Sequence, residues 1–154
     1  MAKPPRTIRV AAMDYLSRRE HATHELFQKL VAKEEYEASE ISEALARLAD
    51  QGLLSDERFT EAFINQRINR GSGPLKIRAE LRQKGISDAM IGTFLNQHNG
   101  LWSESALDVR IKKYGLERPS DLKEIARQTR FLQSRGFTTE HIRYAMNTRH
   151  NDET

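Results

Sequence analysis

The sequence resembles itself when it is aligned with a copy shifted by 51 residues. This internal repeat limits the possible folds of the chain more than any other feature. The shift places K-G-I-S, residues 84–87, on R-G-F-T, residues 135–138, and it pairs Leu81 with Leu132. In each tetrapeptide we expect a basic residue to end a helix, a glycine to adopt the left-handed conformation, and a hydroxyl residue to cap the next helix. A period of this length is typical of repeat proteins, in which each unit packs mainly on its neighbours.

A weaker copy of the same pattern lies in the N-terminal part of the sequence. The shift pairs Leu26 with Ile77, but Glu34 stands where a glycine is expected, and one residue is inserted before Ile41. We therefore predict three tandem three-helix repeats, which span residues 7–52, 55–98 and 103–149.

Apolar residues recur at helical spacing along the whole sequence, and no stretch shows the strict alternation of a half-buried strand. Glycines and hydroxyl residues flank these stretches where helix stops and caps are expected. The expected stops are Gly52, Gly85, Gly115 and Gly136, and the expected caps are Ser55, Ser87, Ser103, Ser120 and Thr138 or Thr139. Pro74 suits a first helical position, and Leu122, Ile125 and Leu132 predict an apolar helix face. The sequence thus predicts an all-α fold with nine helices.

The composition excludes several classes of protein. There are no cysteines, so disulfides and thiolate metal sites are excluded. No run of eighteen apolar residues could span a membrane, and the first ten residues lack the apolar core of a signal peptide, so we expect a cytoplasmic protein. The formal charge of +3 permits an acidic partner without requiring one.

Residues 70–87 contain two glycines directly before a predicted helix, which raises the question of a phosphate-binding loop. A dinucleotide loop follows a strand and needs a third glycine, but Lys76 stands at that position and a helix precedes the turn. Neither Gly71 nor Gly73 is followed by the Gly-Lys pair of a P-loop. We therefore interpret the stretch as a corner between two helices, in which Gly71 ends one helix and Pro74 begins the next.

The cations around this corner are spaced so that they repel one another. Arg78 and Arg82 lie four residues apart on a helix, and only Lys76 and Glu80 form a compensating pair. Residues 34–50, by contrast, hold six acidic side chains and one arginine. A solvated helix surface explains the basic cluster as well as a docking face does.

The docking interpretation predicts a basic face that binds nucleic acid or an acidic protein surface. Because aromatic residues outside the apolar stripes are scarce, any contact with DNA should be to the backbone and independent of sequence. The predicted face consists of Arg67, Arg70, Lys76, Arg78, Arg82, Lys84, Lys123, Arg127, Arg130 and Arg135.

The sequence offers no catalytic or metal constellation. His21 and His24 could share a metal ion, but no third ligand has a suitable spacing, and a cap or surface role is favoured for both. No serine lies in G-x-S-x-G, and carboxylates such as Glu34 and Glu37 lie on a charged, solvated surface. We therefore expect neither enzymatic activity nor a cofactor.

The run from Ser55 to Ser87 resembles the RecX family, whose members regulate the RecA recombinase. The resemblance rests on elements spread over about thirty residues, and weaker similarity in the flanks extends it over nearly the whole chain. These elements are Asp56, Arg58-Phe59, Phe63-Ile64, Arg67, Gly71-x-Gly73-Pro74, Ile77, Glu80-Leu81 and Lys84-Gly85-Ile86. Many relatives carry an aromatic residue or a lysine at the position of Ser72.

This resemblance implies a modulator that binds RecA filaments assembled on single-stranded DNA. Members of the family inhibit strand exchange, ATP hydrolysis and the co-protease activity that triggers the SOS response. They are similar to elongated, curved rods of three-helix repeats that lie in the groove of the filament or block its growing end. The expected partner is thus the RecA filament, with possible weak contact to DNA, and we expect a monomer.

A second hypothesis is a general DNA-binding helical protein that acts by occupying the strand. Its affinity for DNA should fall steeply with salt, because counterions are recaptured. Binding to RecA at high salt after nuclease treatment would distinguish the first hypothesis from the second.

Overall fold

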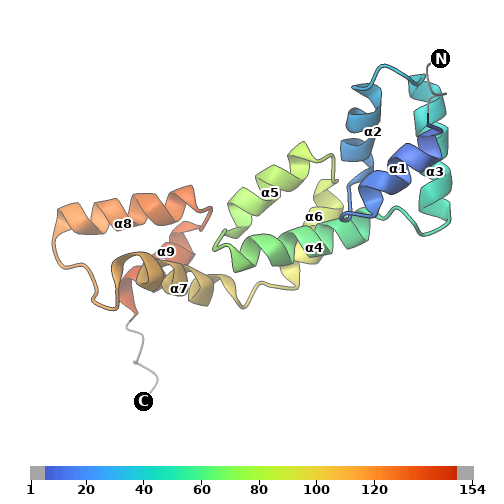
Figure 1. Cartoon of the computed structure of the whole chain (residues 1–154). Coiled ribbons are helices and arrows are strands. Elements are labelled where there is room, and N and C mark those ends of the chain that lie inside the picture. Colours follow the sequence, from blue (N-terminus) through green and yellow to red (C-terminus); the bar gives the residue numbers. More distant parts are fainter. Residues whose placement is uncertain (1–5, 149–154) are drawn as a thin grey trace. The chain divides into compact units, whose positions relative to one another are not determined.

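The computed structural model describes residues 6–148, and in this range the chain forms nine α-helices and no strand (Figure 1). The helices are α1 (Ile8–Leu16), α2 (Thr23–Val31), α3 (Ala38–Asp50), α4 (Asp56–Asn69), α5 (Pro74–Gln83), α6 (Asp88–Asn96), α7 (Trp102–Tyr114), α8 (Leu122–Ser134) and α9 (Thr139–Asn147). The prediction of an all-α fold with nine helices is confirmed for these residues.

Several predicted helix caps are confirmed by their hydrogen bonds. The hydroxyl oxygen of Ser55 accepts from the amide of Arg58 at 3.1 Å, and that of Ser87 accepts from the amide of Met90 at 3.2 Å. Thr138, and not Thr139, caps α9. The four predicted glycine stops all have a positive φ angle, which glycine adopts more readily than residues with a Cβ atom.

Two predicted caps are wrong. Ser120 does not open α8, because the carboxylate of Asp121 accepts from the amide of Glu124 at 2.7 Å and caps the helix. A carboxylate interacts more favourably than a hydroxyl with the positive end of a helix. Ser103 lies inside the first turn of α7, which already begins at the buried residue Trp102.

Glu34 has a φ angle of 57°, and it is the one residue other than glycine with a positive φ angle in residues 6–148. It occupies the position that the 51-residue shift assigns to Gly85 and Gly136 in the other repeats. The N-terminal copy has therefore kept the left-handed corner although it has lost the glycine. A side chain with a Cβ atom is strained in this conformation.

We expect Glu34→Gly to stabilise the protein by up to about 1 kcal/mol, because glycine adopts the left-handed conformation without this strain. The midpoint of urea unfolding, followed by circular dichroism, measures the change. Glu35→Gly is the matched control, since Glu35 is equally exposed and does not have a positive φ angle. Equal effects of the two substitutions would contradict the assignment of the corner.

The chain divides into two compact units. Of the described residues, the first unit comprises 6–62 together with Leu81–Met90, and the second comprises Phe63–Glu80 together with 91–148. The division passes through α4, α5 and α6, so it does not follow the predicted repeats. The repeat boundaries at 7–52, 55–98 and 103–149 stay a prediction, and residue 149 lies outside the described range.

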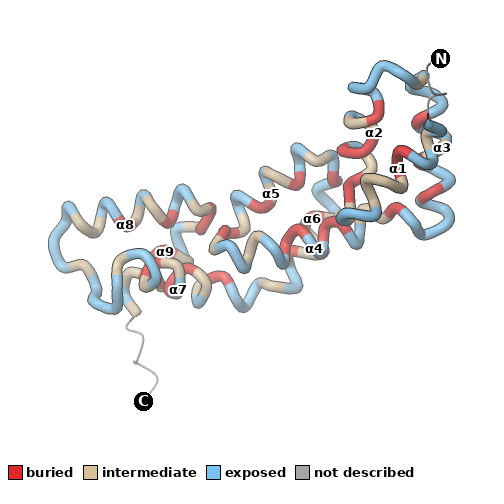
Figure 2. Tube along the Cα trace, in the orientation of Figure 1, coloured by how far each residue is buried: buried red, intermediate tan, exposed pale blue. Residues whose placement is uncertain are grey.

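In the first unit, α1, α2 and α3 pack on one another around a small apolar core. Figure 2 shows buried residues where these three helices meet. The core consists of Ala11, Ala12, Leu26, Leu30, Ile41, Leu45, Leu48 and Leu54. Leu26 and Leu30 of α2, and Ile41, Leu45 and Leu48 of α3, have the helical spacing of a buried face, whereas Leu54 lies between α3 and α4.

In the second unit, α7 packs mainly on α9, and α8 packs on both. Leu132 of α8 is fully buried, as predicted, and Ile125 is partly buried. Leu122, however, is 84% exposed, so its assignment to the apolar face of α8 is wrong. Leu122 is the first residue of α8, directly after the Asp121 cap.

Candidate interaction surface

The corner at residues 70–75 lies between two helices, because α4 precedes it and Pro74 is the first residue of α5. Gly71 has a φ angle of 85° and ends α4, whereas Gly73 has a different function. A Cβ atom on Gly73 would lie 2.5 Å from the carbonyl carbon and oxygen of Gly136. Position 73 thus requires glycine, because the corner at Gly136 approaches it closely. The interpretation of residues 70–75 as a corner between two helices is confirmed.

The two corners are joined through their backbones within the second unit. The amide of Gly73 donates to the carbonyl oxygen of Arg135 at 2.6 Å, and the amide of Leu75 donates to that of Gly136 at 2.9 Å. The helix stops at Gly71 and Gly136, which the sequence presents as separate features, therefore form one joint.

Arg135 also holds this joint with its side chain. Its Nε donates to the carbonyl oxygen of Gly71 at 3.2 Å, and its Nη2 donates to that of Arg70. These carbonyls lie just after the last turn of α4, at the negative end of the helix dipole, where a cation is favourable. Arg135, a residue of the predicted basic face, therefore has a structural function as well.

Arg67 is also engaged within the protein. Its Nε donates to Oε2 of Glu80 at 2.9 Å, and its guanidinium carbon lies 4.3 Å from the centre of the Phe63 ring. The predicted pair of Lys76 with Glu80 is therefore wrong. The planar guanidinium group of Arg67 fits between the aromatic ring and the carboxylate better than an ammonium group would.

An open hollow of about 450 Å³ lies beside the joint. It is lined by Arg67, Arg70, Ser72, Lys76, Glu80 and Arg135. Four cations from α4, α5 and the corner after α8 thus surround one concave surface, together with a single carboxylate. The other oxygen of that carboxylate, Oε1, is buried and has no hydrogen-bond partner among the described residues.

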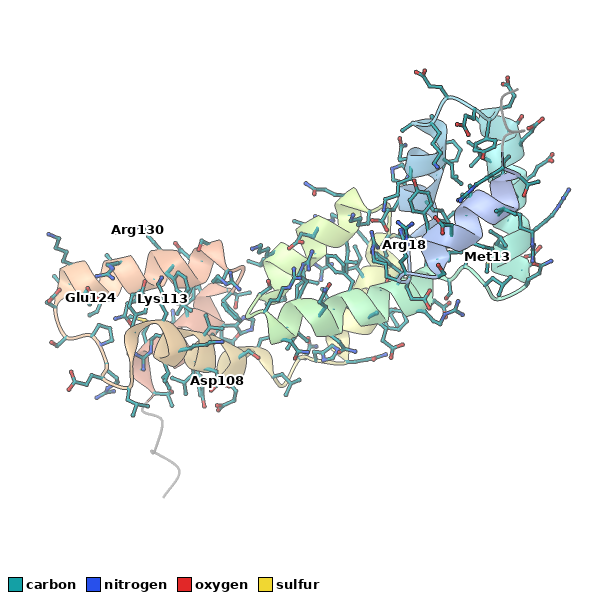
Figure 3. The ribbon with its side chains drawn as sticks, viewed as in Figure 1. Met13, Arg18, Asp108, Lys113, Glu124 and Arg130 are labelled. Atoms are coloured by element: carbon teal, nitrogen blue, oxygen red, sulfur yellow. The ribbon has the colours of Figure 1, made fainter. Side chains whose placement is uncertain are left out.

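A second hollow, of about 670 Å³, lies between the end of α4, α7 and α8. It shares Arg70 and Arg135 with the first hollow, and Lys112 and Lys113 line it as well. The sequence analysis did not single out these two lysines, although they are adjacent cations at the end of a predicted helix. Figure 3 shows Lys113 between α7 and α8, where its Nζ lies 5.4 Å from the centre of the Phe131 ring.

The other predicted cations of the second unit lie outside these hollows. Lys123 and Arg130 are exposed, and Figure 3 shows Arg130 on the side of α8 that faces away from α7. Arg127 pairs with Glu124 at 3.4 Å and lies 5.3 Å from the centre of the Tyr114 ring. Arg78 of α5 is half-buried.

Five of the predicted cations make no side-chain hydrogen bond or ion pair with any described residue. These are Arg70, Lys76, Arg78, Lys123 and Arg130. Their charges are thus available to a partner, whereas those of the paired cations are partly neutralised within the chain.

In the first unit, two basic side chains clamp the buried carboxylate of Glu25. Arg19 binds both of its oxygens, at 3.0 and 2.8 Å, and Lys84 binds Oε2 at 2.7 Å. Burial raises the pKa of this carboxyl, but the hydrogen bonds from Arg19 and Lys84 outweigh burial and lower it to about 2. Lys84, predicted for the basic face, thus neutralises an internal carboxylate, and Arg82 pairs with Asp88 at 2.7 Å.

His21 is buried beside this clamp, so the predicted surface role is wrong for it. Its Nδ1 lies 3.1 Å from the carbonyl oxygen of Arg19, and its Nε2 lies 3.1 Å from Nζ of Lys29. Burial lowers the pKa of His21, and an imidazole that donates from Nδ1 and accepts at Nε2 satisfies both contacts. His24 is exposed and packs against Gly85.

Residues 6–148 contain neither a metal-binding cluster nor a membrane-spanning helix. No three His, Asp or Glu side chains in this range gather as the ligands of a metal ion would. None of the described helices is long and apolar enough to cross a membrane.

Family models of three consecutive domains match this chain. The model described as RecX, first three-helix domain, matches residues 9–48, the second three-helix domain matches 55–95, and the third matches 103–146. These matches together cover most of the sequence.

Individual relatives and solved structures agree with these matches. Proteins named Regulatory protein RecX are 41% identical in Halorhodospira halophila, over 90% of this chain and 85% of the relative, and 44% identical in Pseudomonas putida, over 90% and 88%. The crystal structure of RecX from Lactobacillus salivarius has a TM-score of 0.75 at 24% identity, over 90% of this chain and 91% of that one. A second structure, of regulatory protein RecX, has a TM-score of 0.80 at 23% identity, over 92% and 72%.

Proposed function

This chain belongs to the RecX family, and from this membership we propose that it regulates the RecA recombinase. It binds RecA filaments on DNA and inhibits strand exchange, ATP hydrolysis and co-protease activity, as a regulator and not as an enzyme. The observation that carries the proposal is the match of all three RecX domains along one chain, with relatives at about 40% identity that bear the name of a regulatory protein. We expect it to act in the cytoplasm as a monomer.

The basic face of the second unit supports this proposal. Arg70, Lys76, Arg78, Lys123 and Arg130 carry charges that no described residue neutralises, so they are the cations we assign to contact with the filament. Three tandem repeats would let such contacts act together along a polymer, so that individually modest interactions gain from multivalency.

The test is DNA-dependent ATP hydrolysis by RecA with this protein added at an equimolar ratio. We expect the rate to fall, and we expect the fall to be smaller for the triple variant Arg78→Ala, Lys123→Ala, Arg130→Ala, whose circular dichroism should match that of the unchanged protein. No inhibition at an equimolar ratio would refute the proposed function. If the unchanged protein and the triple variant inhibit ATP hydrolysis equally, only the assignment of these three cations is refuted.

General DNA binding is a second candidate function, which the unpaired cations of the second unit favour. It predicts inhibition that parallels occupancy of the strand and disappears with added salt. If RecA stays bound to this protein in high salt after nuclease treatment, occupancy of the strand is not sufficient to explain the inhibition.

A further inference from the structure

We propose that the hollow lined by Arg67, Arg70, Ser72, Lys76, Glu80 and Arg135 is a binding site for a phosphate group. The site belongs to the second unit of this chain alone, and the proposal does not depend on any contact with RecA.

The first argument comes from the clamp around Glu25 in the first unit. Glu25 is the third residue of α2, and Arg19 and Lys84 bind its carboxylate. The corner that carries Lys84 packs there on the start of α2, since a Cβ atom on Gly85 would lie 2.5 Å from the Cβ atom of His24. In this joint the corner after α5 meets the start of α2, and the two cations enclose one anion, the carboxylate of Glu25.

The second unit repeats this joint without the oxyanion. The 51-residue shift carries Arg19, Glu25 and Lys84 onto Arg70, Lys76 and Arg135. The residues that follow Glu25 and Lys76, Leu26 and Ile77, are both fully buried, as this correspondence requires. In both joints the glycine of the corner packs on the first turn of the helix, although Gly85 meets the second residue, His24, and Gly136 meets the third, Lys76. Lysine therefore stands where the first unit has its carboxylate, and both clamping positions keep their positive charge.

The charges at this second joint are not balanced within the described chain. Arg67 neutralises Glu80, whereas Arg135 bonds to carbonyl groups at the negative end of the α4 dipole and to no described carboxylate. Arg70 and Lys76 form no ion pair with the described residues. The positive end of the α5 dipole adds to this field, since its first turn contains no acidic residue. Three like charges around one hollow favour an anion from outside.

A phosphate group suits the hollow better than a carboxylate does. One carboxylate satisfies the two cations of the first unit, whereas the second unit offers three cations and hence more donors. Phosphate has more acceptor oxygens than carboxylate, and arginine binds it through two parallel hydrogen bonds. The neighbouring hollow shares Arg70 and Arg135 and adds Lys112, Lys113 and one carboxylate, Asp108. Its charged lining is mainly basic, so cations continue beyond the reach of one anion, as a chain of phosphates requires.

The substitution Lys76→Glu tests the proposal, because it supplies the carboxylate that the first unit has at this position. We expect the variant to bind inorganic phosphate about tenfold more weakly or worse, as measured by calorimetry at constant ionic strength. We also expect its thermal unfolding midpoint to rise, since the new carboxylate is clamped by Arg70 and Arg135. Arg143→Glu is the matched control, with the same change of charge at an exposed residue of α9 that lines neither hollow, and it should neither weaken phosphate binding nor raise the midpoint.

Two further arms identify the source of the phosphate. If Lys76→Glu also weakens binding of a fluorescent oligothymidylate more than Arg143→Glu does, the site takes the backbone of single-stranded DNA. If only inorganic phosphate is affected, the site takes a free phosphate group. The proposal is overturned if the unchanged protein shows no saturable phosphate binding, if both variants weaken binding equally, or if only an oligoglutamate peptide binds in a manner sensitive to Lys76.

Discussion

Gly73→Ala should destabilise the protein by about 3–5 kcal/mol, although the substitution adds a single methyl group. The new Cβ atom would lie 2.5 Å from the carbonyl group of Gly136 and 2.6 Å from the amide nitrogen of Phe137, and backbone atoms cannot rotate away as a side chain can. To relieve this overlap the two corners must separate, which breaks the hydrogen bonds from Gly73 to Arg135 and from Leu75 to Gly136. Strain from overpacking and two lost hydrogen bonds together give the expected loss.

Urea unfolding followed by circular dichroism measures this effect, and Gly92→Ala is the matched control. Gly92 lies inside α6, and a Cβ atom there would meet nothing within 4 Å. Alanine should stabilise that helix by about 0.5–1 kcal/mol, so the same chemical change has opposite signs at the two positions. A stability of Gly73→Ala close to that of the unchanged protein would show that the two corners do not approach each other so closely.

The contrast between these two glycines explains how much of the fold could be predicted from the sequence. Helix ends are local features, because a capping hydroxyl or a left-handed glycine acts within a few residues, and Ser55, Ser87 and Gly85 were placed correctly. The contact of Gly73 with Gly136 joins positions far apart in the sequence. Nothing in either local sequence specifies that contact, so only the structure could supply it.

The candidate site was predicted as a set of residue types but not as an arrangement. The spacing of like charges marked the cations around the corner as unusual, yet it could not show that Arg67 pairs with Glu80. The 51-residue shift already placed Lys76 on Glu25 and Arg135 on Lys84. The change from a carboxylate at Glu25 to a cation at Lys76 could be interpreted only when the structure showed Glu25 clamped between two cations.

Arg110 has a structural role that was not predicted from the sequence. It is fully buried on α7, where its Nε donates to the carbonyl oxygen of Ala145 at 2.8 Å and its Nη1 donates to that of Glu117 at 3.1 Å. No carboxylate pairs with it among the described residues, and burial, with a smaller effect of Arg118, lowers its pKa. Its position four residues after the buried Ala106 was the available signal, because that spacing places both on one face of α7.

Arg110→Met should therefore cost about 3 kcal/mol of stability in the same unfolding experiment. Methionine fills a similar volume and removes the desolvated charge, but it leaves the buried carbonyl oxygen of Ala145 without a donor, and it releases α9 from the loop after α7. The control is Arg118→Met, since Arg118 is exposed and donates to the carbonyl oxygen of Asn147 at 2.8 Å, so its loss should cost less than about 1 kcal/mol. If Arg110→Met is as stable as the unchanged protein, relief of the buried charge outweighs the lost hydrogen bonds. Arg110→Lys then separates the two terms, because it keeps the charge but cannot reach both carbonyl groups with one ammonium group.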